Sequence, residues 1–301
     1  MSFEMVSNEL QEPTVAKWGK WRIVWIDSRR IEASLSVYER GDADGIGISP
    51  YNGYLSEDVG FLKKIENLRG LVVPFPKGLD LSEVQTFSQI RFLTLGSERA
   101  SLDLSQFMQI EELGITLKAK DILPPENSKL SCLRLRNFSP ASGNLESLPP
   151  FNELSALSVA VGSIESLSGI ERYDNLREAE FAYLPKLKKV EAIGRTWVET
   201  LHIETCSSIQ DFAALAKCKS LRRLRYINCG VIGSLAPLRD FKALEEFRFV
   251  KTNVLDGDMT PLMSLKSIGF ENKRHYSHTP EQIDAAIRGE AVFLRRSVTT
   301  H

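Results

Sequence analysis

Large apolar side chains recur along this chain in short alternating pairs, with one other residue between the two members. Residues 221–229, Leu-Arg-Arg-Leu-Arg-Tyr-Ile-Asn-Cys, are the clearest copy, with apolar side chains at the first, fourth and sixth places and a small residue at the ninth. Such a pair predicts a short β-strand with one buried face, because successive side chains of a strand point to opposite sides. The eleven pairs are Ile46/Ile48, Leu71/Val73, Leu93/Leu95, Leu113/Ile115, Leu133/Leu135, Leu157/Val159, Ala179/Phe181, Leu201/Ile203, Leu224/Tyr226, Phe247/Phe249 and Ile268/Phe270.

The spacing of the pairs predicts a repeat. Successive pairs are 20 to 25 residues apart, and ten of the eleven also have a large aliphatic residue three places earlier. A strand this short cannot bury its apolar face alone, so neighbouring units must stack into one continuous core. Parallel strands would then line up about 4.8 Å apart. Because the outer return path takes more room than the strand, the stack should curve with its sheet on the inside.

This pattern resembles the leucine-rich repeat family, whose unit is L-x-x-L-x-L-x-x-N/C, over about residues 44–275. The repeat length resembles the class of about 22 residues found in internalins and phosphatase-regulator repeats. Residues 233–238 and 259–262 resemble the convex segments of that class. The resemblance implies an α/β solenoid, a curved array of about 11 coils with a parallel sheet on its concave face. We divide the chain into an N-terminal β cap (1–43), the repeats (44–271) and a C-terminal cap (272–301).

The ninth place of the unit separates the two halves of the array. In the family this place holds a side chain that satisfies backbone groups where the chain leaves the strand, and Cys206, Cys229 and Thr252 fit that role. Earlier units instead carry residues such as Pro76 and Glu98 at this place. We therefore expect a regular ladder only in the later half, with less regular turns before it.

The ends of a stacked array need caps, because its core would otherwise be exposed. Residues 21–26 and 31–38 both alternate at period two with a turn between them, which predicts a β-hairpin over the first coil. At the other end, Thr279 and Gln282 flank Pro280 as in a capping box, and Gly289 is placed to stop the helix. Residues 291–294 would pack after that helix.

The inner face of the later coils gives the candidate binding site. Side chains that alternate with the buried pairs should point to this face. They place acidic residues beside basic ones, with a histidine between, and such an array suits polar recognition of a protein. A solvated sheet surface, with weak cross-strand pairs, would show the same charges. The candidate residues are Arg134, Arg136, Glu178, Glu180, His202, Glu204, Arg223, Arg225, Glu246 and Arg248.

Other features that suggest chemistry have simpler explanations in the repeat. His275 and His278 have helical metal-ligand spacing, but zinc sites usually need three or four convergent ligands, and no cysteine and few carboxylates lie close in the sequence. Cys206 and Cys229 occupy equivalent places in adjacent units, where a redox pair is conceivable but the repeat already favours a small buried side chain. We expect no metal and no cofactor.

The glycine-rich segment 41–47 contains neither a phosphate-binding loop nor a dinucleotide fingerprint, and fits a loop before the first coil. It carries Asp42 and Asp44, but not the twelve-residue calcium-loop pattern. No nucleophile elbow, zinc-protease or kinase signature occurs anywhere in the chain, so we expect no enzyme.

Charge and composition narrow the partner class. Lys plus Arg is 38 and Asp plus Glu is 39 among 301 residues, a net charge of −1, which argues against general attraction to nucleic acid or anionic membrane. Residues 1–18 have no apolar run typical of a secretion signal, and no window approaches the ~20 apolar residues of a membrane span. Four cysteines fit reduced thiols in a cytoplasmic protein.

The sequence therefore predicts a non-catalytic, cytoplasmic scaffold that binds a protein partner along its inner face, is a monomer and has a bacterial origin. The alternatives are an inhibitor or immunity-type protein against a toxin or enzyme, and an exported effector. Binding of carbohydrate or nucleic acid would call for inner-face aromatics or a basic stripe, and Phe92 is the one aromatic expected there.

Overall fold

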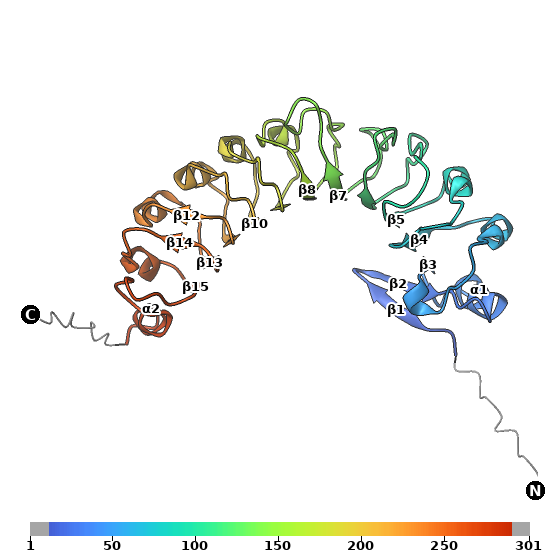
Figure 1. Ribbon diagram of the computed structural model, residues 1–301, viewed down its shortest axis with the longest axis horizontal. Helices are drawn as coiled ribbons and strands as arrows, with labels where there is room; N and C mark the ends of the chain where they lie inside the picture. The colour runs from blue at the N-terminus through green and yellow to red at the C-terminus, as the bar shows by residue number, and fades with distance from the viewer. Residues whose placement is uncertain (1–11, 291–301) are drawn as a thin grey trace, which may run out of the picture. The chain divides into compact units, whose positions relative to one another are not determined.

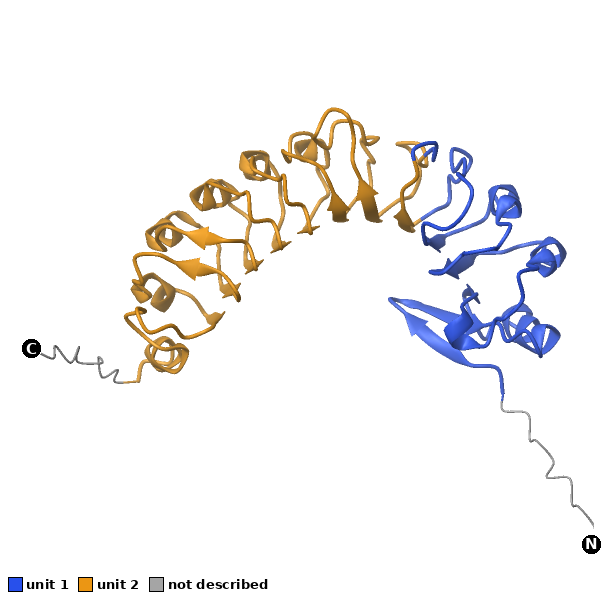
Figure 2. Ribbon diagram, viewed as in Figure 1, with its two compact units in different colours: residues 1–110, 119–122 blue, residues 111–118, 123–301 orange. Residues whose placement is uncertain are grey.

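A computed structural model of the chain describes residues 12–290. The chain folds into two compact units (Figure 2). The first holds the residues up to 110 together with 119–122, and the second holds 111–118 and the residues from 123 onward. Each unit is described by itself below.

The first unit begins with a hairpin and a helix and continues as three parallel coils (Figure 1). Its strands are β1 (Val15–Trp18), β2 (Trp21–Trp25), β3 (Gly45–Gly47), β4 (Gly70–Val73) and β5 (Phe92–Leu95). Its helices are α1 (Ile31–Glu39) and the 3₁₀ turns η1 (Pro50–Asn52), η2 (Gly60–Lys64) and η3 (Ser82–Thr86). Strand β1 pairs antiparallel with β2, and β2 to β5 pair parallel in chain order.

Each coil of the second unit consists of one inner strand and one outer segment that leads to the next strand. Its inner strands are β6 (Glu112–Thr116), β7 (Cys132–Phe138), β8 (Ala156–Gly162), β9 (Glu178–Ala182), β10 (Thr200–Glu204), β11 (Arg223–Ile227), β13 (Glu246–Phe249) and β15 (Ser267–Phe270). Its outer segments are η4 (Ile170–Arg172), η5 (Glu191–Arg195), η6 (Phe212–Lys217), η7 (Ala236–Asp240) and η8 (Thr260–Ser264), with the small parallel sheet of β12 (Val231–Ile232) and β14 (Asn253–Val254). Within this unit the parallel sheet lines the concave side and the 3₁₀ turns lie on the convex side (Figure 1).

The predicted leucine-rich-repeat-like solenoid is confirmed. Every apolar pair lies in or directly beside a strand, and within each unit these strands pair parallel in chain order. The pair residues and the aliphatic residues before them fill the core; Leu221, Leu224 and Tyr226 are each at most 1% exposed. The short apolar pair thus buries its face by stacking on its neighbours, as the pattern requires.

The prediction for the N-terminal cap was wrong in one element. Residues 31–38 form helix α1, and the hairpin consists of β1 and β2. Strand β2 pairs with β1 on one edge and with β3 on the other, so no free edge remains for a strand from residues 31–38. Ser34, Leu35, Val37 and Tyr38 of α1 are buried, which is the spacing of one helix face and not that of a strand, where every second residue would be buried.

The C-terminal helix agrees with its predicted start and stop. Helix α2 (Pro280–Ile287) begins with a capping box, in which the Thr279 hydroxyl accepts from the Gln282 backbone and the Gln282 side chain accepts from the Thr279 backbone. Gly289 has a φ of 76° directly after the helix, as a stop signal does. Ile283 is fully buried, so α2 covers the core beside β15. The packing predicted for residues 291–294 lies outside the described residues.

Strand exits differ between the two units, but the regular exit begins earlier than the ninth-place residues predicted, because it also precedes Phe138, Gly162 and Leu184. In the second unit the residue before the ninth place adopts a left-handed conformation in six coils, at Asn137, Val161, Tyr183, Thr205, Asn228 and Lys251. Among the described residues of the first unit, no residue other than glycine has a positive φ. The ladder itself is buried: the thiols of Cys206 and Cys229 donate to backbone carbonyls of Phe181 and Ile203 in the preceding coils.

A buried ion pair holds residues 119–122 within the first unit. The Arg99 and Asp121 side chains are both 0% exposed and meet at 2.8 Å between Nη2 and Oδ2. The second carboxylate oxygen of Asp121 accepts from the Leu102 backbone at 2.9 Å, and Arg99 also donates to the Ala100 carbonyl. Residues 119–122 are therefore held against residues 99–104 by a hydrogen-bonded ion pair.

Candidate partner-binding surface

The predicted site residues lie together on the inner face of the second unit. Register places Ser158, Glu180, His202 and Arg225 directly opposite one another on the consecutive strands β8 to β11. The residues two positions earlier on each strand point to the same face and form a second row, with Glu178 opposite Thr200 and Thr200 opposite Arg223. Neighbouring strands are about 4.8 Å apart. The acidic and basic residues predicted on this face are therefore neighbours in space, as alternation required.

Several of these charges are already used within the sheet. Arg134 Nη1 lies 3.5 Å from Glu112 Oε2 on the neighbouring strand. Arg223 donates from Nη2 to the Thr200 hydroxyl at 2.9 Å. The remaining pair is Arg248 Nε and Glu246 Oε1, 2.5 Å apart. The exposed ion pairs of Arg134 and Arg248 each contribute only about 0–1 kcal/mol to stability, whereas Arg223 is bonded to a neutral hydroxyl that does not cancel its charge.

His202 lies between two carboxylates. Its Nδ1 is 3.4 Å from Glu180 Oε1, and its Nε2 is 3.6 Å from Glu204 Oε2. Glu180 also accepts a hydrogen bond of 2.8 Å from the Ser158 hydroxyl. Hydrogen bonding from His202 lowers the pKa of Glu180, against the opposing effect of burial and with help from Ser158. This network keeps Glu180 ionised and fixes the centre of the face.

Three predicted residues have side chains without an internal partner. Arg136, Glu178 and Arg225 are exposed, and none of these side chains makes a hydrogen bond or ion pair with any residue between 12 and 290. Glu178 on β9 and Arg225 on β11 are two strand spacings apart and offset by two residues along the strands, which is about 12 Å in all. The inner face therefore presents a free carboxylate and a free guanidinium on either side of His202, whose buried Nε2 has no hydrogen-bond partner within residues 12–290.

A shallow hollow of about 290 Å³ lies beside Glu178. Strand β8 contributes only small side chains to this face, Ala156, Ser158 and Ala160, between the arginines of β7 and the glutamates of β9. Cys132 and Arg134 line the hollow on one side. The predicted site did not include Cys132, Ala156 or Ser158. The sequence signal for Ala156 and Ser158 is a coil whose inner-face positions are all small, between two coils that each carry two charged residues on this face.

The inner face of the first unit is closed by its own side chains. Trp21 stacks on Phe92 with ring centroids 4.5 Å apart, and Trp25 and Val72 complete the buried cluster. The Phe92 ring lies flat against Gly70, where an added Cβ would come within 1.9 Å of the ring. Phe92 is 1% exposed, so it cannot serve as a stacking surface for bases or sugars.

The residues considered for metal or redox chemistry have structural roles. His275 Nε2 lies 2.9 Å from the Val254 carbonyl oxygen, and His278 Nδ1 lies 2.9 Å from the Ser277 hydroxyl. Within residues 12–290 no group of three or more His, Cys, Asp or Glu side chains could hold a metal ion. Burial raises the pKa of Cys206 to about 12 and that of Cys229 to about 11, which disfavours the reactive thiolate.

In the same described part of the chain, no helix combines the length and the apolar character needed to cross a membrane.

Among known proteins, this chain shows similarity only to solved structures. No protein-family model matches the sequence, and no curated protein matches it. Among solved structures, the chain is similar to the functional domain of InlJ from Listeria monocytogenes, which is described as including a cysteine ladder. The TM-score is 0.47 at 15% sequence identity, with 74% of this chain and 48% of that chain covered. This chain thus spans about half the length of that structure.

Proposed function

We propose that this chain is a non-catalytic scaffold that binds a protein partner on the inner face of its second unit. The observation that carries the proposal is the pair of unpartnered charges, Glu178 on β9 and Arg225 on β11, which lie on either side of β10, with Glu178 beside a hollow. Fixed charges without internal partners can pair with complementary charges of a partner without first breaking an internal ion pair, and they orient it. A cation of the partner would meet Glu178 at the hollow, and a carboxylate would meet Arg225.

The placement of Cys132 and His202 supports a binding role over catalysis. Both line the hollow, and a thiol with a histidine is a common nucleophile and base. They lie on β7 and β10, three strand spacings apart and offset by two residues, which is about 16 Å. A nucleophile and its base must lie within hydrogen-bond reach, so these two side chains do not form such a pair.

A charge exchange at the two residues tests the proposal. Affinity capture with wild-type protein and mass spectrometry would first identify the partner, and titration calorimetry would then give its affinity. We expect the double variant Glu178→Lys/Arg225→Glu to bind the partner at least about tenfold more weakly, because both contacts become like-charged. Alkylation of Cys132 should slow when the partner is bound, since this thiol lines the hollow.

The matched control makes the same exchange on the convex side. Glu191 and Lys217 are exposed residues of η5 and η6, so Glu191→Lys/Lys217→Glu leaves net charge unchanged and should leave affinity unchanged. Equal affinity of the inner-face variant and the wild type would refute the proposal. The identity of the captured protein separates the finer roles: a toxin or enzyme indicates an inhibitor, and a protein of another organism indicates an exported effector. The bacterial origin, the cytoplasmic location and the monomeric state remain predictions alongside these roles.

A further inference from the structure

The charges on the inner face of the second unit are arranged in stripes that follow the strands. On each of three alternate strands, β7, β9 and β11, two neighbouring positions of this face carry charges of the same sign. The strands between them differ: β8 presents only small side chains, and β10 presents Thr200, His202 and Glu204. The stripes are Arg134 and Arg136 on β7, Glu178 and Glu180 on β9, and Arg223 and Arg225 on β11.

Each stripe keeps one charge that the fold does not use. Arg136, Glu178 and Arg225 are exposed and make no hydrogen bond or ion pair with any residue between 12 and 290. Their order across the strands is basic, acidic and basic. A partner segment can therefore pair with all three stripes without breaking an internal ion pair, provided that its own charges follow the order acidic, basic and acidic.

The spacing of the stripes fits an α-helix that lies across the strands. Strands β7, β9 and β11 are separated by two strand spacings each, which is about 10 Å. Residues i and i+7 of an α-helix are two turns and about 10.5 Å apart, on nearly the same face. In an extended strand, residues on one face are about 6.8 or about 13.5 Å apart, and neither distance matches the stripes.

The hollow between the first two stripes adds an apolar position to this helix. Its volume is about 290 Å³, and Ala156, Leu157 and Ala179 are among its lining residues. Strand β8, which presents only alanine and serine to the inner face, lies about 4.8 Å from β7. On a helix whose acidic residue lies over β7, the residue at i+3 or i+4 lies about 4.5–6 Å further along. An apolar side chain at that place would reach the hollow.

We propose that the inner face binds an α-helix of its partner, laid across β7 to β11. The helix carries an acidic residue over β7, an apolar residue three or four places later, a basic residue at i+7 and a second acidic residue at i+14. Arg136, Glu178 and Arg225 pair with its three charges through charge-assisted hydrogen bonds. This inference rests on the proposed function and adds the kind of segment that the face recognises. A nucleic acid does not fit, because its continuous negative charge would meet the acidic stripe of β9.

Fluorescence anisotropy with the full chain tests the spacing. The probe is a labelled, alanine-based peptide of about 21 residues, long enough to form a helix, which carries a glutamate, a leucine three places later, a lysine seven places later and a second glutamate fourteen places later. The comparison peptide has the same composition, but its lysine follows the first glutamate by five places and lies on another side of the helix. We expect the first peptide to bind at least about tenfold more tightly at low ionic strength, and salt to release it. Circular dichroism checks that the two peptides are equally helical.

The variant Glu178→Lys tests the central contact. It removes the acidic charge that faces the lysine of the first peptide, so it should weaken binding about tenfold or more through like-charge repulsion. A third peptide, with glutamate in place of the lysine, should bind Glu178→Lys more tightly than it binds the wild type, because the central stripe is then less acidic. A gain of this kind cannot come from a loss of fold.

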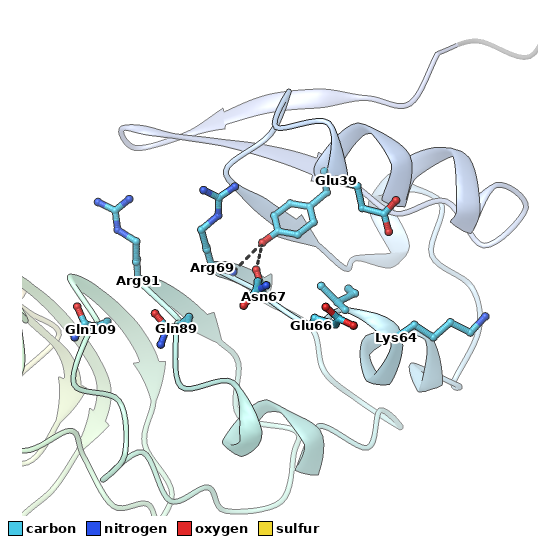
Figure 3. Close-up of a pocket in the computed structure, with 10 residues that line it drawn as sticks. Glu39, Lys64, Glu66, Asn67, Arg69, Gln89, Arg91 and Gln109 are labelled. Carbon is cyan, nitrogen blue, oxygen red and sulfur yellow. Dashed lines mark hydrogen bonds between the residues drawn. The ribbon is translucent and has the colours of Figure 1, made fainter.

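A hollow in the first unit provides the control surface (Figure 3). Its volume is about 580 Å³, and it lies between α1 and the residues that lead into β4 and β5. Lys64 and Arg69 line it together with Glu39 and Glu66, so its charges favour neither sign of ligand. The exchange Glu66→Lys/Arg69→Glu leaves the net charge unchanged, and it should leave the binding of all three peptides unchanged.

The helix assignment is overturned if the first peptide does not bind, if it binds no more tightly than the comparison peptide, or if Glu178→Lys and the control exchange weaken it equally. The proposed function still stands in that case if Glu178→Lys/Arg225→Glu weakens the captured partner. In the captured partner, the segment that this chain protects from hydrogen exchange should be a helix with acidic, basic and acidic residues in that order. Protection of an extended segment instead would also contradict the assignment.

Discussion

At the scale of single residues, Cys206, Cys229 and Thr252 show how the fold uses a side chain that sequence alone leaves ambiguous. Each is at most 2% exposed and hydrogen-bonds to a backbone carbonyl of the preceding coil. A thiol or hydroxyl at this place satisfies an oxygen that the tight exit from the strand would otherwise leave unpaired. The two cysteines are thus hydrogen-bond donors within the core and have no exposed surface for redox exchange.

The buried thiols predict a fall in stability at high pH. Their pKa values lie above the ordinary 9.0, at about 12 for Cys206 and about 11 for Cys229, so the folded state favours the protonated form. The stability is fully present below pH 9 and is lost as the pH rises toward these values, by up to about 1.4 kcal/mol per pH unit for each thiol. Urea unfolding between pH 9 and 11 should show a steeper decline for wild type than for Cys206→Ser.

The serine variant isolates this effect, because its hydroxyl keeps the donor but does not titrate in that range. An identical pH slope for the two proteins would contradict the thiol explanation. The same burial predicts that alkylation of the native protein modifies Cys132 before Cys206 or Cys229, a result that peptide mass spectrometry can read directly.

At the scale of elements, the strand exits of the second unit carry a cost. Six residues other than glycine are left-handed there, and for an L-residue this conformation costs about 1–2 kcal/mol. Asn137 and Asn228 suit it best, because asparagine tolerates it and their side chains hydrogen-bond to Leu117 and Thr205 of the preceding coils. Val161, with a φ of 56°, is branched at Cβ and suits it least.

We therefore expect Val161→Asn to stabilise the protein by about 0.5–1 kcal/mol, by relieving backbone strain. Val161 is 39% exposed, so little apolar burial is lost. Val231, which is 52% exposed in strand β12 and has no positive φ, provides the control. Val231→Asn should be neutral or slightly destabilising, because asparagine is disfavoured in strands. Thermal unfolding measures both, and a destabilised Val161→Asn would rule out relief of strain.

The elements also show which parts of the structure the sequence could predict. The strands were predictable because each apolar pair has one way to bury its face, and their register then placed Glu178 and Arg225 on the inner face. Helix α1 was missed because residues 31–38 fit two periodicities, and the choice depends on β1 occupying the free edge of β2. Which charges pair internally depends on rotamers across strands, which no repeat pattern specifies.

At the scale of the whole molecule, the two units differ in their inner faces and in the side chains that can report their unfolding. The first unit fills its inner face with Trp21, Trp25 and Phe92, whereas the second keeps an open, charged inner face. Three of the four tryptophans lie in the first unit, and the fourth, Trp197, is already 62% exposed. All four cysteines lie in the second unit. Tryptophan emission therefore reports unfolding of the first unit, and thiol exposure reports unfolding of the second.

This division permits a test of how far a local change spreads. In a repeat array, stability is approximately a sum of nearest-neighbour terms, so a defect should weaken its own coils most. Gly70→Ala would force a methyl group into the Phe92 ring, which cannot move away because Trp21 stacks on it. We expect a loss of about 1–3 kcal/mol in the first unit. The urea midpoint from tryptophan emission should fall, and the midpoint from thiol exposure should fall much less.

Gly233→Ala serves as the control, because nothing lies within 4 Å of the added methyl group and Gly233 has no positive φ. Both of its midpoints should stay near those of the wild type. Equal shifts of the two probes in Gly70→Ala would mean that the chain unfolds as one cooperative block. In that case a change in the first unit could also act on the inner face, and the stability of the control variant Glu66→Lys/Arg69→Glu would have to be measured before it is used. Unequal shifts would justify using that variant as an independent control of the inner face.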